Sequence, residues 1–279
     1  MRHLVMVVVS LVLSGGLTCR AFFMADLGPR NARRGGFAGA GVAVVPIGGL
    51  ADLNYNPASI AMAGNYQIKL VGGYITDIDV GYIGAELFAP LRNFALSFDM
   101  GAEFGDEDQA WDLGFGGAVR PLPVQLALGM DISVYYVKHD GDDGGNSVGP
   151  EFVPEFGVLY RSKSGFNLGA RFNMEDEDVG VPSSFSIGAA YQPSKSPFLF
   201  GVEYEDVDIA EESVFYGYGE FKILESPIAL RAGIGFPDEG DDILFGVGVS
   251  FMYPGTSVDL FVTKLNDQDP IMIGAGFSF

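Results

Sequence analysis

Apolar and polar residues alternate along most of this chain, and the alternation is clearest at its carboxyl end. In an extended strand, successive side chains point to opposite sides. Residues 271–279 therefore form one apolar face opposite a face of mostly small residues. The apolar face carries Ile271, Ile273, Ala275, Phe277 and Phe279. This alternation predicts a β-strand with one apolar face.

The same pattern recurs from residue 66 onward and divides the rest of the chain into fourteen candidate strands. An even number, with lengths often close to the ~9–11 residues of a tilted membrane strand, is typical of bacterial outer-membrane barrels. The predicted strands are Tyr66–Ile75, Val80–Phe88, Phe94–Phe104, Trp111–Val119, Val124–Val137, Phe152–Arg161, Phe166–Asn173, Phe185–Gln192, Phe198–Glu205, Val214–Ile223, Ile228–Phe236, Ile243–Tyr253, Val258–Lys264 and Ile271–Phe279.

The connections between these strands are of two kinds, in strict alternation. Every second one is short and has no acidic cluster: Ala89–Asn93, Arg120–Pro123, Ser162–Gly165, Pro193–Pro197, Leu224–Pro227 and Pro254–Thr256. The others hold most of the Asp and Glu residues: Thr76–Asp79, Gly105–Asp108, Lys138–Pro150, Glu175–Asp178, Asp206–Glu212, Pro237–Asp242 and Asn266–Asp269. An up-and-down meander with two different ends gives this alternation, and outer-membrane barrels have short periplasmic turns and longer outer loops.

Together these patterns predict an all-β fold, a 14-stranded antiparallel transmembrane β-barrel over residues 65–279. After the first twenty residues, no apolar run approaches the ~20 residues of a transmembrane helix, so strands would make any membrane crossing. Closing the sheet removes the edges that a bilayer does not tolerate. The alternative is a secreted, soluble all-β protein with acidic loops and a two-layer core.

The amino terminus has the pattern of a secretory signal peptide, residues 1–21. Arg2 and His3 precede an apolar stretch, Leu4–Leu13, of signal-peptide length. We expect cleavage after Ala21; the alternative is a bacterial lipoprotein in which Cys19 is lipidated. Cleavage after Ala21 leaves a chain without cysteine, which needs no disulfide framework.

Residues 22–64 differ from the rest, because they are rich in glycine and alanine and lack the sustained alternation. Fourteen strands enclose more space than wall side chains can fill, since about eight strands is where they just suffice. We therefore predict that this segment is a plug, or hatch, inside the barrel. Gly39 and Gly41 do not form a nucleotide-binding fingerprint, since the third glycine and the βαβ context are absent.

If the apolar faces meet lipid, the opposite faces line the lumen, the space that the sheet encloses. Two interpretations of the charges there stay open, and both can hold. The charges brace the wall and hold the hatch as ion pairs, or they form a selectivity lining for a polar solute. The predicted lumen-lining residues are Lys69, Asp99, Glu103, Asp112, Asp131, Arg171, Glu203, Arg231 and Asp259.

Charge and composition exclude several functions. A formal net charge of -20 argues against a nucleic-acid partner, which requires clusters of Lys and Arg. Residues 22–279 contain one histidine, His139, in a predicted loop and no cysteine, so we expect no enzyme and no cofactor. The carboxylates of 138–145 suggest calcium but lack the twelve-residue loop with its closing Glu, so no metal site is predicted. The acidic loops could bridge lipopolysaccharide phosphates through divalent cations.

Two stretches in the predicted hatch resemble a known family. Residues 36–44, Gly-Phe-Ala-Gly-Ala-Gly-Val-Ala-Val, are followed by residues 53–61, Leu-Asn-Tyr-Asn-Pro-Ala-Ser-Ile-Ala. This pattern resembles the amino-terminal signature of the FadL-like outer-membrane proteins, which include the long-chain fatty acid transporters and the PorV/PorQ proteins. The resemblance implies a 14-stranded barrel in which Asn56, Pro57 and Ala58 lie in a luminal hatch that gates a hydrophobic ligand. This chain is much shorter than the fatty acid transporters and has small outer loops.

The function predicted from the sequence is passive uptake of small hydrophobic or amphipathic molecules across the bacterial outer membrane. The alternative is a barrel that does not transport and serves, like the PorV group, as an anchor or shuttle for secreted proteins. The expected partners are outer-membrane lipid and lipopolysaccharide, a hydrophobic ligand, and the barrel assembly machinery. We expect Phe277 and Phe279 to take part in barrel closure and in the assembly signal.

Overall fold

The structure is a computed structural model. It describes residues 41–42, 44, 56–63, 66–76, 80–105, 108–121, 125–139, 147–174, 183–193, 196–207, 212–238, 243–253, 256–264 and 271–278. The predicted signal peptide, residues 1–21, lies outside the described residues, as do most of the predicted hatch (22–64), Gly39 and Phe279.

All fourteen predicted strands are present, in the predicted order. They are β1 (Gln67–Ile75), β2 (Val80–Leu91), β3 (Phe94–Phe104), β4 (Asp108–Val119), β5 (Leu126–His139), β6 (Ser147–Arg161), β7 (Phe166–Asn173), β8 (Ser184–Tyr191), β9 (Phe198–Val207), β10 (Glu212–Lys222), β11 (Ile228–Pro237), β12 (Leu244–Tyr253), β13 (Thr256–Lys264) and β14 (Ile271–Ser278). The one helix in the described part of the chain is a 3₁₀ helix, η2 (Pro57–Met62). No described helix has the length and hydropathy of a membrane span.

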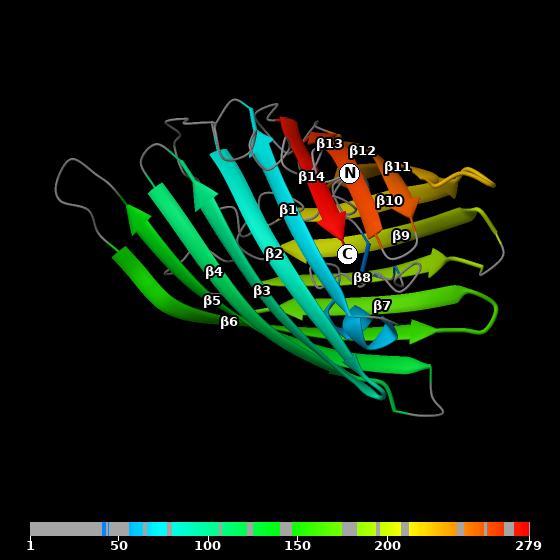
Figure 1. Cartoon of the computed structure of the whole chain (residues 1–279), viewed down its shortest axis with the longest axis horizontal. Coiled ribbons are helices and arrows are strands. Elements are labelled where there is room, and N and C mark those ends of the chain that lie inside the picture. Colours follow the sequence, from blue (N-terminus) through cyan, green and yellow to red (C-terminus); the bar gives the residue numbers. More distant parts are fainter. Residues whose placement is uncertain are drawn as a thin grey trace.

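The fourteen strands form a closed barrel, as predicted (Figure 1). Each strand pairs antiparallel with its neighbours in sequence, and β14 closes the cylinder by pairing with β1. In this closing ladder, Leu70 is the register partner of Phe277 and Tyr74 is the register partner of Ile273. Phe277 thus lies in the closing ladder. Because the meander is up-and-down, the six short turns lie at one end and the acidic connections at the other.

The predicted connection Lys138–Pro150 is wrong in its bounds. Strand β5 continues to His139 and β6 begins at Ser147, where Lys138 and Ser147 are register partners. The register shifts between Tyr135 and Val137, as at a β-bulge. Backbone hydrogen bonds do not require apolar side chains, so the ladder extends beyond the apolar stripe that the sequence pattern marks.

The apolar faces of the strands lie on the outside of the barrel. In β8 the side chains of Phe185 and Ile187 are exposed, whereas Ser184 and Ser186 are buried in the interior. Val247, in the middle of β12, is 50% exposed. The apolar stripes therefore do not pack against each other, which contradicts the soluble two-layer alternative.

Exposed aromatic residues gather near both ends of this outer surface. Those near the short turns are Tyr66, Phe94, Tyr160, Phe166, Tyr191, Phe198, Phe221 and Tyr253. Those near the acidic connections are Phe104, Tyr136, Phe152, Phe172, Phe185, Tyr204, Phe215, Phe236 and Phe245. Outer-membrane barrels have such aromatic girdles on both sides of an apolar outer band.

Glycines and aromatic residues share the inner surface. The ring of Tyr82 lies over Gly73, and the ring of Tyr218 lies over Gly201, so that a Cβ atom at either glycine would collide with the tyrosine. The rings of Tyr82 and Phe261 approach Gly274 in the same way. Large side chains thus lie across neighbouring strands and occupy part of the lumen.

Val247→Arg tests the lipid-facing surface. A charged residue on the lipid side of a barrel at the bilayer midplane costs about 2–4 kcal/mol, and near the interface about 0–1 kcal/mol. We expect Val247→Arg to lower the free energy of unfolding from liposomes by the larger amount, and Tyr253→Arg at the strand end to lower it by the smaller. Urea titration monitored by Trp111 fluorescence measures both. Equal, near-zero effects would mean that this face meets water.

Candidate functional site

The predicted hatch contains a short, buried helix. Asn56 precedes η2 and caps it, since its side-chain Oδ1 accepts a hydrogen bond of 3.0 Å from the backbone N–H of Ala58. Pro57 follows at the first helical position, where its missing N–H costs nothing. The side chains from Pro57 to Ala61 are all buried. The Asn-Pro-Ala sequence is therefore a helix start folded into the interior of the barrel.

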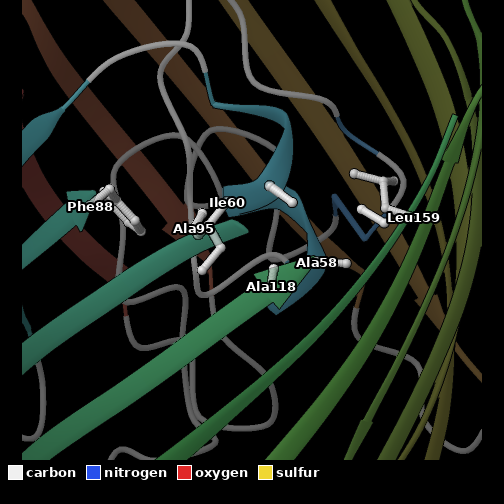
Figure 2. Close-up of a cluster of buried hydrophobic side chains, with 8 residues drawn as sticks. Ala58, Ile60, Phe88, Ala95, Ala118 and Leu159 are labelled. Atoms are coloured by element: carbon white, nitrogen blue, oxygen red, sulfur yellow. The ribbon is translucent and has the colours of Figure 1, made fainter. Parts of the chain in front are cut away.

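Helix η2 packs against the inner wall near the short turns. Ala58, Ile60 and Ala61 form a buried cluster with Phe88, Ala95, Ala118, Ala127 and Leu159, which lie at the short-turn ends of β2 to β6 (Figure 2). Burying one large apolar side chain contributes about 1.5–3 kcal/mol. The hatch is thus attached to the wall by apolar packing over five strands.

Two glycines of the wall let the hatch backbone lie directly on the sheet. Gly129 of β5 and Gly157 of β6 are register partners. A Cβ atom at Gly129 would collide with the backbone of Pro57 and Ala58, and one at Gly157 with the side chain of Asn56 and the ring of Pro57. We call Gly129 and Gly157 the glycine seat. Any larger residue in the seat would push the hatch away from the wall.

The amide of Asn56 connects the hatch to two wall strands. Its Nδ2 donates to the backbone carbonyls of Val158 in β6 (3.0 Å) and Ala170 in β7 (3.1 Å), which are register partners. It also donates to the carbonyl of Val42 (3.1 Å), in an earlier part of the hatch. Asn56 is fully buried. One side chain thus joins two parts of the hatch to each other and to the wall.

The earlier part of the hatch contacts another sector of the barrel. The carboxylate of Glu203 in β9 accepts from the backbone N–H groups of Gly41 (2.6 Å) and Val42 (2.8 Å). Gly41 has a φ of 140°, which favours glycine. Val44 packs in a cluster with Leu199, Val214, Tyr216, Tyr218 and Leu244. The described hatch residues therefore lie against strands on both sides of the barrel, from β2 to β7 and on β9, β10 and β12.

All nine residues predicted to line the lumen lie on the inner face of their strands. Several are ion-paired, and the distances between their charged atoms are 2.9 Å for Arg171 and Glu205 and 2.6 Å for Arg231 and Glu220. Arg231 also lies 2.7 Å from Asp259, and Lys69 lies 3.6 Å from Glu86. The remaining predicted residues are all acidic. Glu203 lies on β9, and the other four lie together on β3 to β5: Asp99, Glu103, Asp112 and Asp131.

Sequence reasoning did not name Glu86, Glu205 and Glu220, which pair with three of the predicted cations. Two of these pairs could have been found, because Lys69 and Glu86, and Arg231 and Glu220, are register partners on adjacent strands. Arg171 and Glu205 lie two strands apart, on β7 and β9, so adjacency gives no signal for them. The glycine seat was also missed, since nothing in the sequence separates Gly129 and Gly157 from the other luminal glycines.

Several solved structures share this fold. A monoaromatic hydrocarbon channel, CymD, has a TM-score of 0.71 at 13% identity, over 92% of this chain and 98% of that chain. The toluene transporter TbuX of Ralstonia pickettii has a TM-score of 0.64 at 12% identity, over 91% and 97%. The outer membrane protein Omp33 of Acinetobacter baumannii has a TM-score of 0.51 at 11% identity, over 77% and 96%.

The chain has the fold of the hydrocarbon channels. That fold is the FadL-type 14-stranded barrel, so the fold implied by the sequence resemblance is confirmed. No protein-family model and no characterised protein matches the sequence.

Gly157→Ala tests the glycine seat. The added methyl group collides with Asn56 and Pro57, so we expect η2 to leave the wall more often. In a chain carrying Ala58→Cys and lacking Cys19, the rate of thiol modification should rise several-fold. Gly217→Ala is the matched control, since its Cβ atom would come no closer than 4.0 Å to the side chain of Ile234. Equal rates in both variants would contradict the seat.

Proposed function

We propose that this protein is an outer-membrane channel for passive uptake of small hydrophobic or amphipathic molecules, with the hatch controlling passage. The observation that carries the proposal is the buried seat of Asn56, Pro57 and Ala58 on the inner wall. A separate segment that is held inside a closed barrel by a few side-chain contacts can move without breaking the sheet. The proposed organisation is signal peptide 1–21, hatch 22–64 and barrel 65–279.

The outer surface supports a location in the bacterial outer membrane. The apolar faces point outward, and aromatic residues flank the apolar band at both ends of the barrel. Antiparallel barrels with an even strand number are the form in which bacterial outer-membrane proteins cross the bilayer. Lipid would contact this band, and lipopolysaccharide would contact the acidic end, with divalent cations between its phosphates and the carboxylates. Phe277, in the closing ladder, is a candidate contact for the barrel assembly machinery.

The substrate class rests on two lines of support. The structures of similar fold include a monoaromatic hydrocarbon channel and a toluene transporter. In addition, apolar clusters surround both described parts of the hatch, one around Ile60 and Phe88 and one around Val44. A solute that passes the displaced hatch therefore meets apolar wall, which favours molecules with an apolar portion.

The energy that holds the hatch is compatible with gating. Each hydrogen bond from Asn56 contributes about 0.5–1.5 kcal/mol net, and the burial of Ile60 adds about 1.5–3 kcal/mol. An opening cost of several kcal/mol keeps the open state rare but reachable. A ligand that binds the wall better when the hatch has left would shift this equilibrium.

The depth of the hatch also favours a second candidate function. Asn56 and Ala58 are fully buried, and a hatch held in this way suits a barrel that does not conduct and instead anchors or shuttles secreted proteins. Such a barrel would bind a protein partner and show no permeability. Flux measurements therefore separate the two functions.

Asn56→Asp tests the channel. The substitution keeps the capping oxygen but removes the amide donors and places a carboxylate against three carbonyl oxygens, so the hatch should leave its seat. We expect liposomes that contain the wild-type protein to take up phenyl glucoside, a neutral amphipathic solute, faster than protein-free liposomes. The variant should raise that rate several-fold.

Asn93→Asp, in the turn between β2 and β3, is the matched control and should leave the rate unchanged. Uptake no faster than in protein-free liposomes for both the wild type and Asn56→Asp would remove the channel and leave the anchoring role.

A further inference from the structure

The inner wall is divided by charge. On β7 to β13 the two arginines are matched by carboxylates: Arg171 by Glu205, and Arg231 by Glu220 and Asp259. Among the described residues of β1 to β5, Lys69 is the only cationic side chain that faces the lumen, and it is paired with Glu86. Arg120, directly after β4, donates to Sδ of Met62 in η2, at the short-turn end. The other charges of β1 to β5 that face the lumen are acidic.

Four carboxylates make up this acidic face, and they do so in a specific arrangement: Asp99, Glu103, Asp112 and Asp131. Asp99 of β3 and Asp112 of β4 reach across to each other's strand. The carboxylate of Asp99 lies over Gly114, its register partner, and that of Asp112 lies over Gly101. A Cβ atom at either glycine would collide with the carboxylate above it. These carboxylates line one cavity together with Glu86, Glu103, Val71 and Tyr82.

Asp131 of β5 adds a buried carboxylate oxygen. Its Oδ2 accepts a hydrogen bond of 3.1 Å from Ser133, the register partner of the Gly114 that lies under Asp99. Asp131 therefore lies on the strand next to Asp112 and shares its inner face. Asp131 is 5% exposed, and its Oδ1 has no hydrogen-bond partner among the described residues. Burying a charged acceptor without a partner is costly, and a positively charged group nearby would offset that cost.

The neighbourhood indicates which kind of cation fits. No group of three or more potential metal ligands is found in the described part of the chain, so a chelated metal ion is not indicated. The wall here already contains a bound ammonium group, that of Lys69. Its Nζ lies 3.6 Å from Glu86 and 5.2 Å from the ring centroid of Phe88. Carboxylate and aromatic ring together are the surroundings that proteins offer to alkylammonium groups.

We propose that the acidic face is the selectivity element of the channel and admits small amphipathic cations, such as protonated or quaternary amines, in preference to anions. This inference rests on the proposed channel function and names its substrate class. Walls of one charge in a narrow passage raise the local concentration of counter-ions by about 10-fold or more. Anionic amphipaths such as fatty acids are disfavoured by the same field.

Three aromatic probes of similar size test the proposal in liposomes that contain the full chain: radiolabelled phenyltrimethylammonium, phenyl glucoside and benzenesulfonate. The expected order of uptake is cation, then neutral solute, then anion, with about a 10-fold gap between cation and anion. If the neutral probe is taken up and the anion matches or exceeds the cation, the selectivity is overturned while the channel stands. If no probe is taken up, both are overturned.

A planar bilayer measurement tests the same preference for cations with inorganic ions. Under a tenfold KCl gradient, the reversal potential of the wild-type protein should give a K⁺/Cl⁻ permeability ratio well above one. The triple variant Asp99→Asn, Asp112→Asn, Asp131→Asn should reduce that ratio several-fold. Glu225→Gln, an exposed carboxylate in the turn between β10 and β11, removes a charge outside the lumen and should leave the ratio unchanged. A wild-type ratio near or below one, or equal effects of the triple variant and the control, overturns the proposal.

Discussion

The pairing of β14 with β1 is the contact on which the rest of this structure depends. A sheet in a bilayer must satisfy every backbone N–H and C=O within itself, since an unsatisfied group in hydrocarbon costs several kcal/mol. Closure through Leu70 and Phe277 removes both edges at once. Once the cylinder is closed, side chains alternate strictly between lipid and lumen, so the two-residue period of the sequence becomes an outside and an inside.

Closure also explains why chain is found inside the barrel and how its described residues are held. Fourteen strands leave an interior that their own side chains do not fill. The described hatch residues occupy part of that space without joining the sheet: Asn56 bonds to wall carbonyls, and Glu203 accepts from hatch N–H groups. Glycine at 129 and 157 brings the two backbones into contact. The described residues of this segment are thus held by side chains and not by a β-ladder.

Each pattern in the sequence reports on some features of the structure and not on others. Alternation and loop charge report directly on faces and ends, so all fourteen strands and the inward position of residues such as Asp131 and Arg231 were predictable. The extent of β5 and β6 was not, because their ladder continues through polar residues near Lys138 and Ser147. Pairing between strands two apart, as for Arg171 and Glu205, depends on side-chain reach across an intervening strand, which no local pattern reports. The glycine seat was hidden among many other inward glycines.

The most direct test of the account is a spin-label scan of β12 in liposomes, one nitroxide at a time from residue 245 to residue 250. Collision rates with oxygen, which dissolves in lipid, are compared with those of a water-soluble nickel chelate. The account predicts oxygen-dominated collisions at Phe245, Val247 and Val249 and not at the intervening positions, which face the lumen. Chelate-dominated collisions at those three positions, or no alternation along the strand, would contradict a barrel whose apolar face meets lipid.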